Sequence, residues 1–579
     1  MKNINLKIMA VIMVTAMVLT GCGLNKMVRS YDEMITYTPR TNPLEFHGGE
    51  IMVEVDGRVS EKYFHRSAII ELTPVLRYDG KEKELGMILL RGENTEGEGQ
   101  VMNEGGAPSN FVISEEIEFE EGMENMELVV KGVLYKQGSD DKQELPVREG
   151  IAFGTVMTPN YIEKDEDISL APHGYELETI ITKKASIYFD YMKHNLNWRL
   201  ALNQDEEAKA KIEALNEFLK QGWKLQSVEV NAWASPEGEV AYNEELSEDR
   251  AKTAERYIKN ILNKEYKETE DDLAEVVANA KGEDFDGFMA LLNASELQDK
   301  QAIANVINSQ LAPAERERKI KDMTIIYGEI EKILEPLRRA EIIVEAFEPK
   351  KTKEEITELS TSNPSELDDK ELLYAAVLTD DLDTKEAIYK AVTEQYPQNY
   401  AGFNNLAFVY LEKGEIEQAA AMLEKANQIE PDNGHVLNNL GVVASWTGDL
   451  ENAKSYYEAA QGKGIRTNYN IGNIMIVEGD YTAAVSSYAG RTCRSNVALA
   501  HMLNDNYQAA TTNIECVTPK TAHSHYLSAI IGARRDLTNM VYDNLKKAIE
   551  LDPEYKEKAK NDLEFFKVRD QAEFQDIVN

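Results

Sequence analysis

Hydrophobic and polar positions alternate along the chain from about residue 39 to residue 158. Residues 51–55 and 68–78 follow a period of two and end at Asp-Gly turns, and runs at 113–119 and 126–135 continue the pattern. Helical periodicity is absent here, so we predict a β-sandwich domain over residues 39–175. Its last part carries Asp165-Glu166-Asp167. This run lacks the alternating ligands and the glycine of a calcium loop, so we expect a solvated linker.

The middle of the chain mixes strand and helix patterns. Strands are predicted at 185–191 and 226–234, and a helix at 206–220 places Ile212, Leu215 and Leu219 on one face. A turn of sequence ASPEG at 234–238 then leads into a long amphipathic helix. We predict an α/β domain over 176–348, in which residues 266–334 form a helical insertion.

The last third of the chain repeats with a fixed period. Asn405-Leu406-Ala407 and Asn439-Leu440-Gly441 stand 34 positions apart, and so do Gly414 and Gly448. A period of 34 resembles the tetratricopeptide repeat (TPR), a pair of antiparallel helices. The resemblance implies an all-α solenoid over 372–568, with a linker at 349–371 before it and a tail at 569–579 after it. The predicted fold class is therefore a multidomain α+β chain.

The first residues predict a targeting segment. Lys2 and Lys7 precede an apolar stretch over 8–19, which is too short to span a bilayer. Leu19-Thr20-Gly21-Cys22 follows and resembles the lipobox of bacterial lipoproteins. The resemblance implies a signal peptide over 1–21, an acylated Cys22 and a tether over 22–38. The residue next to Cys22 is glycine and not aspartate, so we expect an anchor in the outer membrane. Lys26 and Arg29 precede the first acidic residue, which favours the periplasmic face, with the cell surface as the open alternative.

Composition narrows the classes of partner. The chain has 579 residues, 63 Lys and Arg against 102 Asp and Glu, and a net charge of −39, which disfavours binding to nucleic acid. A hydrophobic content of 42% is enough to bury several cores. The three cysteines are too few for a zinc site or a disulfide scaffold. A disulfide between Cys493 and Cys516 and two buried thiols both remain open. We predict no cofactor and no metal.

The predicted helix that follows the ASPEG turn carries a second family resemblance. Residues 243–251 read N-x-x-L-S-x-x-R-A, which is similar to the OmpA-like peptidoglycan-binding domain. The resemblance implies that Asn243 and Arg250 belong to a site in which the arginine holds the diaminopimelate carboxylate of peptidoglycan. Ser235 occupies the position of the family's aspartate, and Glu237 is a displaced source of a carboxylate. One alternative is a structural Arg250 that pairs with Asp249 or Glu245 or caps local structure. The other is a domain that has kept its fold and lost or changed its ligand.

The repeat resemblance implies a concave groove that binds partner segments. The first helix of each pair lines such a groove, and amides and aromatic rings suit a bound peptide. The residues that we expect to contact a partner are Asn404, Phe408, Asn438, Val442, Trp446, Tyr469 and Asn473. For Phe408 and Trp446, packing between neighbouring repeats is the alternative.

Motifs of common enzyme classes are absent from the sequence. It contains no nucleophile elbow, P-loop, dinucleotide fingerprint, HExxH helix or CxxC pair. We therefore predict a non-catalytic, lipid-anchored scaffold that tethers the outer membrane to peptidoglycan and recruits protein partners through the TPR groove. One alternative is an accessory subunit of an outer-membrane or surface-appendage assembly or transport machine, whose OmpA-like domain binds protein. The other is an envelope hydrolase with an unrecognised site.

Overall fold

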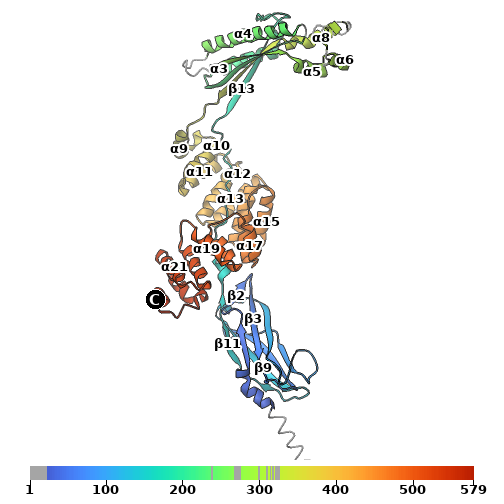
Figure 1. Ribbon diagram of the computed structural model, residues 1–579. Coiled ribbons are helices and arrows are strands. Elements are labelled where there is room, and N and C mark those ends of the chain that lie inside the picture. The colour runs from blue at the N-terminus through green and yellow to red at the C-terminus, as the bar shows by residue number, and fades with distance from the viewer. Residues whose placement is uncertain are drawn as a thin grey trace, which may run out of the picture. The chain divides into compact units, whose positions relative to one another are not determined.

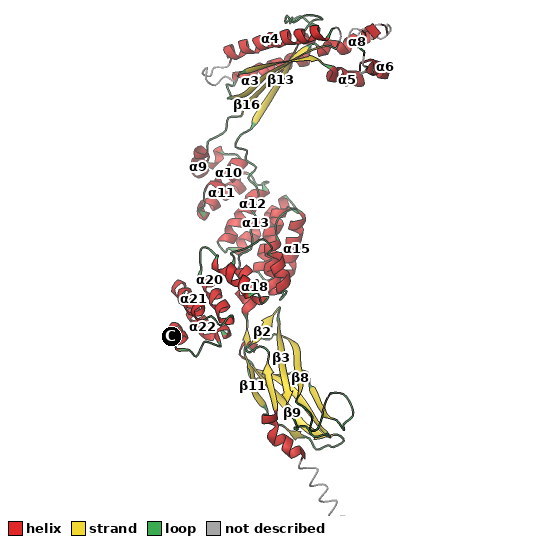
Figure 2. Cartoon of the chain, viewed as in Figure 1, coloured by secondary structure: helices red, strands yellow, loops and turns green. Residues whose placement is uncertain are grey.

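The computed structural model describes residues 23–579 except 237–238, 266–274, 298–299, 308, 310, 313–314, 316–317, 320–321 and 323–326. The chain divides into two compact units. The first unit combines the residues up to Pro172 with Asp380–Asn579, and the second unit spans His173–Thr379. The second unit is thus an insertion between two parts of the first. Figure 1 labels the elements of both units, and Figure 2 separates their strands from their helices.

The N-terminal part of the first unit is rich in β-structure. One sheet has the order β1-β3-β2-β12 with β8 also paired to β3, and the other has the order β10-β9-β4-β6-β7 with β11 on β9 and β5 on β4. The strands are β1 (Ile35–Pro39), β2 (Leu44–His47), β3 (Glu50–Val59), β4 (Ala68–Tyr78), β5 (Lys81–Glu84), β6 (Ile88–Gly92), β7 (Gln100–Met102), β8 (Ser109–Glu118), β9 (Glu127–Lys136), β10 (Gln143–Glu144), β11 (Arg148–Phe153) and β12 (Thr155–Val156), with the short helix η1 (Met123–Asn125) before β9.

The two sheets share one hydrophobic core. In the long antiparallel pair β3 and β8, register runs from Glu50 opposite Glu118 to Val59 opposite Ser109. Because successive side chains of a strand point to opposite faces, every second residue of β3 is buried in this core. The predicted period of two is therefore the burial pattern of these strands, and the β-rich N-terminal region is confirmed.

The predicted tether over 22–38 differs from the structure. Residues 23–34 form a helix, followed directly by β1, and Met27 and Tyr31 of this helix are buried in the core of the two sheets. The Tyr63 hydroxyl also donates to the Met27 carbonyl at 3.0 Å. An amphipathic helix so close to the β-rich region packs on it, because burial of its apolar face is favourable.

The second unit is built on a mixed sheet in the order β13-β16-β14-β15. Its central strands β14 and β16 are antiparallel, whereas β14 and β15 are parallel. The elements are β13 (Ile180–Tyr188), α2 (Ala201–Gln204), α3 (Glu206–Lys220), β14 (Leu225–Ala234), α4 (Val240–Glu265), β15 (Val276–Glu283), α5 (Phe285–Ala294), α6 (Lys300–Ile307), α8 (Tyr327–Leu334), η4 (Glu335–Leu337) and β16 (Arg339–Phe347). Apolar side chains of α3 and α4 share a core with the sheet.

Two predictions for this part of the chain were wrong. Residues 276–283 were expected within a helical insertion but form the sheet strand β15, because its pairing with β14 outweighs a weak local pattern. The expected linker 349–371 contains α9 (Lys353–Ser362), η5 (Pro364–Glu366) and the start of α10 (Asp369–Ala375), which η6 (Ala376–Leu378) follows. Capping boxes at Thr352 and Asp368 begin both α-helices.

Helical pairs make up the C-terminal part of the first unit. The helices are α11 (Leu382–Gln395), α12 (Tyr400–Glu412), α13 (Ile416–Ile429), α14 (Gly434–Trp446), α15 (Leu450–Gly462), α16 (Asn468–Val477), α17 (Tyr481–Ser487), α18 (Ser495–Leu503), α19 (Tyr507–Glu515), α20 (Ala522–Arg534), α21 (Thr538–Leu551), α22 (Glu554–Asn561), η7 (Leu563–Phe565) and α23 (Ala572–Val578). Gly441 illustrates the tight packing, since a Cβ there would lie 2.5 Å from the Tyr457 ring.

The array differs from its predicted bounds at both ends. Residues 372–379 belong to the second unit, and the array begins with α11. The expected tail 569–579 contains α23, whose Phe574 and Val578 are buried in the core of the array. Its apolar residues at i and i+4 lie on one helical face and therefore pack inward.

Membrane spans and metal clusters were sought in the described part of the chain. No helix among these residues combines the length and hydrophobicity needed to cross a bilayer. The same residues contain no group of three or more His, Cys, Asp or Glu side chains placed to hold a metal ion.

Candidate functional site: an asparagine ladder on the repeat array

An extended segment of the chain lies along the repeat helices. It follows β12 and the short helix η2 (Thr158–Tyr161), and it ends just before the second unit. We call residues 163–171 the strap. Its residues contact α12, α14, α16 and α18, the first helices of successive pairs, in the reverse of their chain order. The face on which we predicted that a partner binds therefore holds part of this chain.

Four asparagines hold the main chain of the strap. Each side chain accepts from the N–H and donates to the C=O of a single strap residue, so both groups of that residue are satisfied. The pairs are Asn496 with Glu163, Asn470 with Asp167, Asn439 with Ser169, and Asn405 with Ala171. In this order, the distances from the strap N to Oδ1 are 2.8, 2.7, 2.7 and 2.8 Å, and those from Nδ2 to the strap O are 2.8, 3.0, 2.8 and 3.1 Å.

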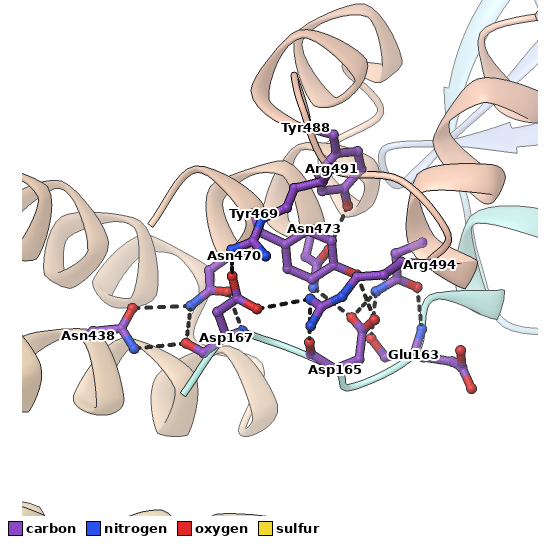
Figure 3. Close-up of polar contacts among 11 residues, drawn as sticks. Glu163, Asp165, Asp167, Asn438, Tyr469, Asn470, Asn473, Tyr488, Arg491 and Arg494 are labelled. Atoms are coloured by element: carbon purple, nitrogen blue, oxygen red, sulfur yellow. Dashed lines mark hydrogen bonds and ion pairs between the residues drawn. The ribbon is translucent and has the colours of Figure 1, made fainter. Parts of the chain in front are cut away.

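Two further asparagines contact the main chain of the strap. Asn438 donates to the Asp167 carbonyl at 2.9 Å, and Asn404 donates to the Ser169 carbonyl at 3.0 Å. Asn470 donates in turn to Asn438 at 3.2 Å. We call these six residues the asparagine ladder; none is more than 2% exposed. Figure 3 shows its central part, where dashed lines join Asn438 and Asn470 to the Asp167 main chain and to each other.

The residue type explains the geometry of the ladder. A side-chain amide carries a donor and an acceptor side by side, which matches the N–H and C=O of one residue in an extended chain. Alternate residues of such a chain point the same way and repeat about every 6.6 Å. The residues held at both groups all have odd numbers, as this period requires. The ladder thus recognises main chain rather than a particular sequence.

Acidic side chains of the strap are held at its N-terminal half. Asp165 accepts from the Tyr469 hydroxyl at 2.5 Å, from Asn496 at 2.6 Å and from Asn473 at 3.4 Å. Burial nevertheless raises the pKa of Asp165 to about 6, since removal from water penalises the carboxylate more than these hydrogen bonds favour it.

Two arginines pair with the next acidic residue of the strap. Asp167 forms ion pairs with Arg491 and, at 3.0 Å, with Arg494. The guanidinium of Arg494 also lies 4.1 Å from the centre of the Tyr469 ring, which places it between the ring and the strap (Figure 3). Glu166 accepts from the Ser445 hydroxyl at 2.9 Å and from the Trp446 indole N–H.

The run 165–167 is therefore not the solvated linker that we expected. Glu166 is only 9% exposed, and Asp165 and Asp167 are also shielded by the array. A charge run is buried here because each carboxylate meets donors supplied by the repeat helices, which compensate for lost hydration.

The chain is also fixed just before the strap. Tyr161 of η2 and Tyr526 of α20 both donate to Asp562, the latter at 2.7 Å. Their rings lie 5.6 Å apart in an edge-on contact, and Lys558 lies 4.2 Å from the centre of the Tyr161 ring. Burial raises the pKa of Asp562 above its usual value. This cluster attaches the end of the β-rich region to the array.

The structure brings most of the predicted groove residues to the strap. Contacts to it are made by Asn404, Asn438, Trp446, Tyr469 and Asn473. Val442 instead is fully buried, and Phe408 is partly exposed.

Sequence reasoning missed the four asparagines that hold both main-chain groups. A signal for two of them was present, since the dipeptides Asn404-Asn405 and Asn438-Asn439 recur at the repeat period. Asn470 and Asn496 lie at spacings of 31 and 26 residues instead, so the period of 34 does not reveal them.

The two cysteines of the array are joined. Cys493 and Cys516 form a disulfide with their Cα atoms 4.9 Å apart. Cys493 lies between Arg491 and Arg494 in the sequence, so the disulfide attaches the loop that carries both arginines to the end of α19. Of the two alternatives that the sequence left open, the structure has the disulfide.

The second candidate site lies in the second unit, at the start of α4. Arg250 is 1% exposed, and its guanidinium donates to the carbonyls of Lys193, Trp233 and Asp190 at 3.0, 2.9 and 3.3 Å. It also lies 5.3 Å from the centre of the Phe189 ring. These contacts are structural, although they differ from the ion pair with Asp249 or Glu245 that the sequence suggested.

The other predicted residues of this site are engaged with neighbouring side chains. Ser235 is 5% exposed and accepts from Nε of Arg338 at 3.3 Å, while Arg338 pairs with Glu331 at 2.7 Å. Asn243 donates to Glu283 at 2.8 Å. Glu237 lies outside the described residues, as does Cys22, the predicted site of lipidation.

Comparisons with known proteins bear on the array. A family model described as tetratricopeptide repeat matches residues 383–440, and a second model of the same description matches 434–462. No curated protein matches the chain.

Solved structures also resemble the chain at low identity. PilW, titled a widely conserved type IV pilus biogenesis factor, is 15% identical over 39% of this chain and 99% of its own, with a TM-score of 0.28. The pilF protein of Pseudomonas aeruginosa is 14% identical over 39% and 98%, with a TM-score of 0.27. A tetratricopeptide repeat protein of Parabacteroides merdae is 15% identical over 48% and 99%, also with 0.27. The family models identify residues 383–462 of the chain as tetratricopeptide repeats.

Proposed function

We propose that this protein is a non-catalytic scaffold of the bacterial envelope, anchored by lipid on Cys22 to the outer membrane and facing the periplasm. The observation that carries the scaffold role is the asparagine ladder, which holds an extended main chain through its N–H and C=O groups. Such contacts position a segment without making or breaking a covalent bond. A lipid anchor would add to this by raising the local concentration of weakly bound partners at the membrane.

The anchor is supported by the lipobox-like residues 19–22. Its test is metabolic labelling with a radioactive fatty acid, followed by membrane fractionation of the wild-type chain and Cys22→Ala. We expect label and membrane association in the wild type and neither in the variant. Label in Cys22→Ala, or membrane association without Cys22, would contradict the proposed anchor.

Two ligands are considered for the second unit. The motif over 243–251 supports peptidoglycan, because it resembles the OmpA-like domain. The burial of Arg250 weighs against this ligand, because its guanidinium donates to three carbonyls of its own domain. On this observation we favour the role of accessory subunit in an outer-membrane or surface-appendage assembly machine, and peptidoglycan tethering is the second candidate.

Co-sedimentation with purified sacculi separates these candidates. The chain from residue 23 onward is compared with Ser235→Asp, which restores the family's carboxylate, and with Ser114→Asp, which adds the same charge at an exposed position of β8 in the first unit. Tethering predicts sedimentation of the parent chain that increases only in Ser235→Asp. A protein-binding unit predicts no sedimentation of the parent chain. Release of soluble fragments from the sacculi would instead support the hydrolase alternative and refute the non-catalytic role.

A further inference from the structure

The strap occupies the ladder mainly through groups that every polypeptide has. Its contacts to Asn405, Asn439 and Asn470 involve only main-chain N–H and C=O groups of the strap. An extended segment of another protein offers the same groups with the same period. The ladder is therefore complementary to a class of segments, of which the strap is the covalently attached member.

Side chains of the array restrict that class by charge. Arg491 and Arg494 face Asp167, and hydroxyl, indole and amide donors face Asp165 and Glu166. These groups are donors or cations, so they complement carboxylates and disfavour lysine or arginine in the same positions. The suitable segment is extended and carries an acidic residue at the position of Asp167, opposite the two arginines.

One feature of the strap weakens its own attachment. The Asp165 carboxylate lies on the array in surroundings that raise its pKa, so its charged form is less favourable there than in water. A segment with one unfavourably buried carboxylate is easier to replace than a segment whose polar groups all have favourable contacts. Residues 172–179, which link the strap to β13, form no helix or strand, and Tyr175 of this link stacks on Tyr374 of the second unit.

We propose that the strap is a replaceable internal occupant of the asparagine ladder, and that the array binds an acidic, extended segment of a partner protein when the strap leaves. The inference rests on the proposed scaffold function and names the class of its partner. A covalently attached competitor has an effective concentration of the order of millimolar, so partner binding is weak until the strap is displaced. The strap thereby limits which segments the scaffold accepts.

The test uses a fluorescein-labelled peptide with the sequence of residues 161–172, YIEKDEDISLAP, and fluorescence anisotropy. It is added to the chain from residue 23 onward and to the strap variant Asp165→Ala/Asp167→Ala. We expect binding to the strap variant at least tenfold tighter than to the wild type. A peptide with lysine at the positions of Asp165 and Asp167 serves as the charge control and is expected not to bind.

Two further variants keep the inference falsifiable if the strap variant folds poorly. A site-specific protease sequence placed within 172–179 allows the strap to be cut at its C-terminal end without loss of its side chains. Conversely, Ser169→Cys/His435→Cys joins two residues whose side chains hydrogen-bond at 2.7 Å and locks the strap. Cleavage is expected to increase peptide binding, and the lock to abolish it until reductant is added. The wild type under the same reductant controls for loss of Cys493–Cys516.

The outcomes are distinct for the inference and for the function. Absence of peptide binding to the cleaved, folded chain would overturn the inference, because the ladder would then serve only to hold the strap. Binding that is unaffected by Asn470→Ala in the cleaved chain would overturn it too, because the peptide would lie elsewhere. The scaffold proposal is judged separately by the fatty-acid labelling and sacculus experiments, which do not depend on the ladder.

Discussion

Replacement of Asn470 by alanine tests how strongly the ladder holds the strap. In the wild type, Asn470 accepts from the Asp167 N–H at 2.7 Å and donates to the Asp167 carbonyl at 3.0 Å. The carbonyl keeps its bond from Asn438 at 2.9 Å, whereas the N–H loses the acceptor that Asn470 provides. The side-chain oxygen of Asn438 also loses its donor, the Asn470 amide at 3.2 Å. An unsatisfied buried group costs about 1–3 kcal/mol, so we expect strap docking to weaken by roughly 2–4 kcal/mol.

Limited trypsin digestion measures this change at one bond. Lys164 is an exposed residue of the strap, and cleavage after it requires the strap to leave the array. When opening is fast relative to cleavage, the rate follows the open population, so 2 kcal/mol corresponds to an increase of roughly 30-fold. Mass spectrometry identifies the Lys164–Asp165 cut. Asn452→Ala, at an exposed position of α15, is the matched control, since the Asn452 amide contacts Asp449 and not the strap.

Equal cleavage rates in the two alanine variants would contradict a stabilising role of Asn470 in strap docking. Such a result would mean that the amide contacts add nothing to strap docking beyond what water supplies to the open state. A rise in cleavage throughout the chain, rather than after Lys164, would show global destabilisation instead of local opening.

Three other predictions follow from buried groups. The pKa of Asp165 is about 6 in the folded chain, against 3.8 for the free side chain. Its contribution to the free energy of unfolding, at most about 3 kcal/mol, is therefore complete below pH 4 and is lost as the pH rises through 6. Urea titrations over this pH range should show that Asp165→Asn removes the dependence. Arg250→Ala leaves three carbonyls without their arginine donor, so urea unfolding should report a loss of about 3 kcal/mol or more, against less than about 0.5 for exposed Lys252→Ala. Gly441→Ala places a Cβ 2.5 Å from the Tyr457 ring and should lower the free energy of unfolding by about 1–3 kcal/mol. The double variant Gly441→Ala/Tyr457→Leu should lose less than the sum of the two single variants, and additive losses would argue against a clash.

The asparagine ladder shows how far a candidate site can be predicted from repeats. The face that binds the strap follows from the repeat pattern, and five of the seven residues selected on it contact the strap. The occupant could not be inferred, because Ser169 and Asn439 are separated by 270 residues and no local pattern relates them. The same holds for Asp165 and Tyr469, which are 304 residues apart.

The acidic run of the strap and the motif over 243–251 could not be interpreted from local sequence for the same reason. Asp165-Glu166-Asp167 has the composition of a solvated linker, and only the donors of distant helices make its burial favourable. Arg250 occupies the position of a ligand-binding arginine, yet three carbonyls on other segments engage it. A residue's position in a motif does not reveal which groups the fold places around it.

The β-rich N-terminal region and the helical repeats could be predicted from local sequence patterns. Both depend on periodicity, since a period of two or a repeat of 34 records which side of each element is buried. Three features could be seen only in three dimensions: the second unit is inserted into the first, β15 completes its sheet, and the strap fills the ladder. These features depend on which buried polar groups meet across long sequence separations, and that pairing is fixed by packing in three dimensions.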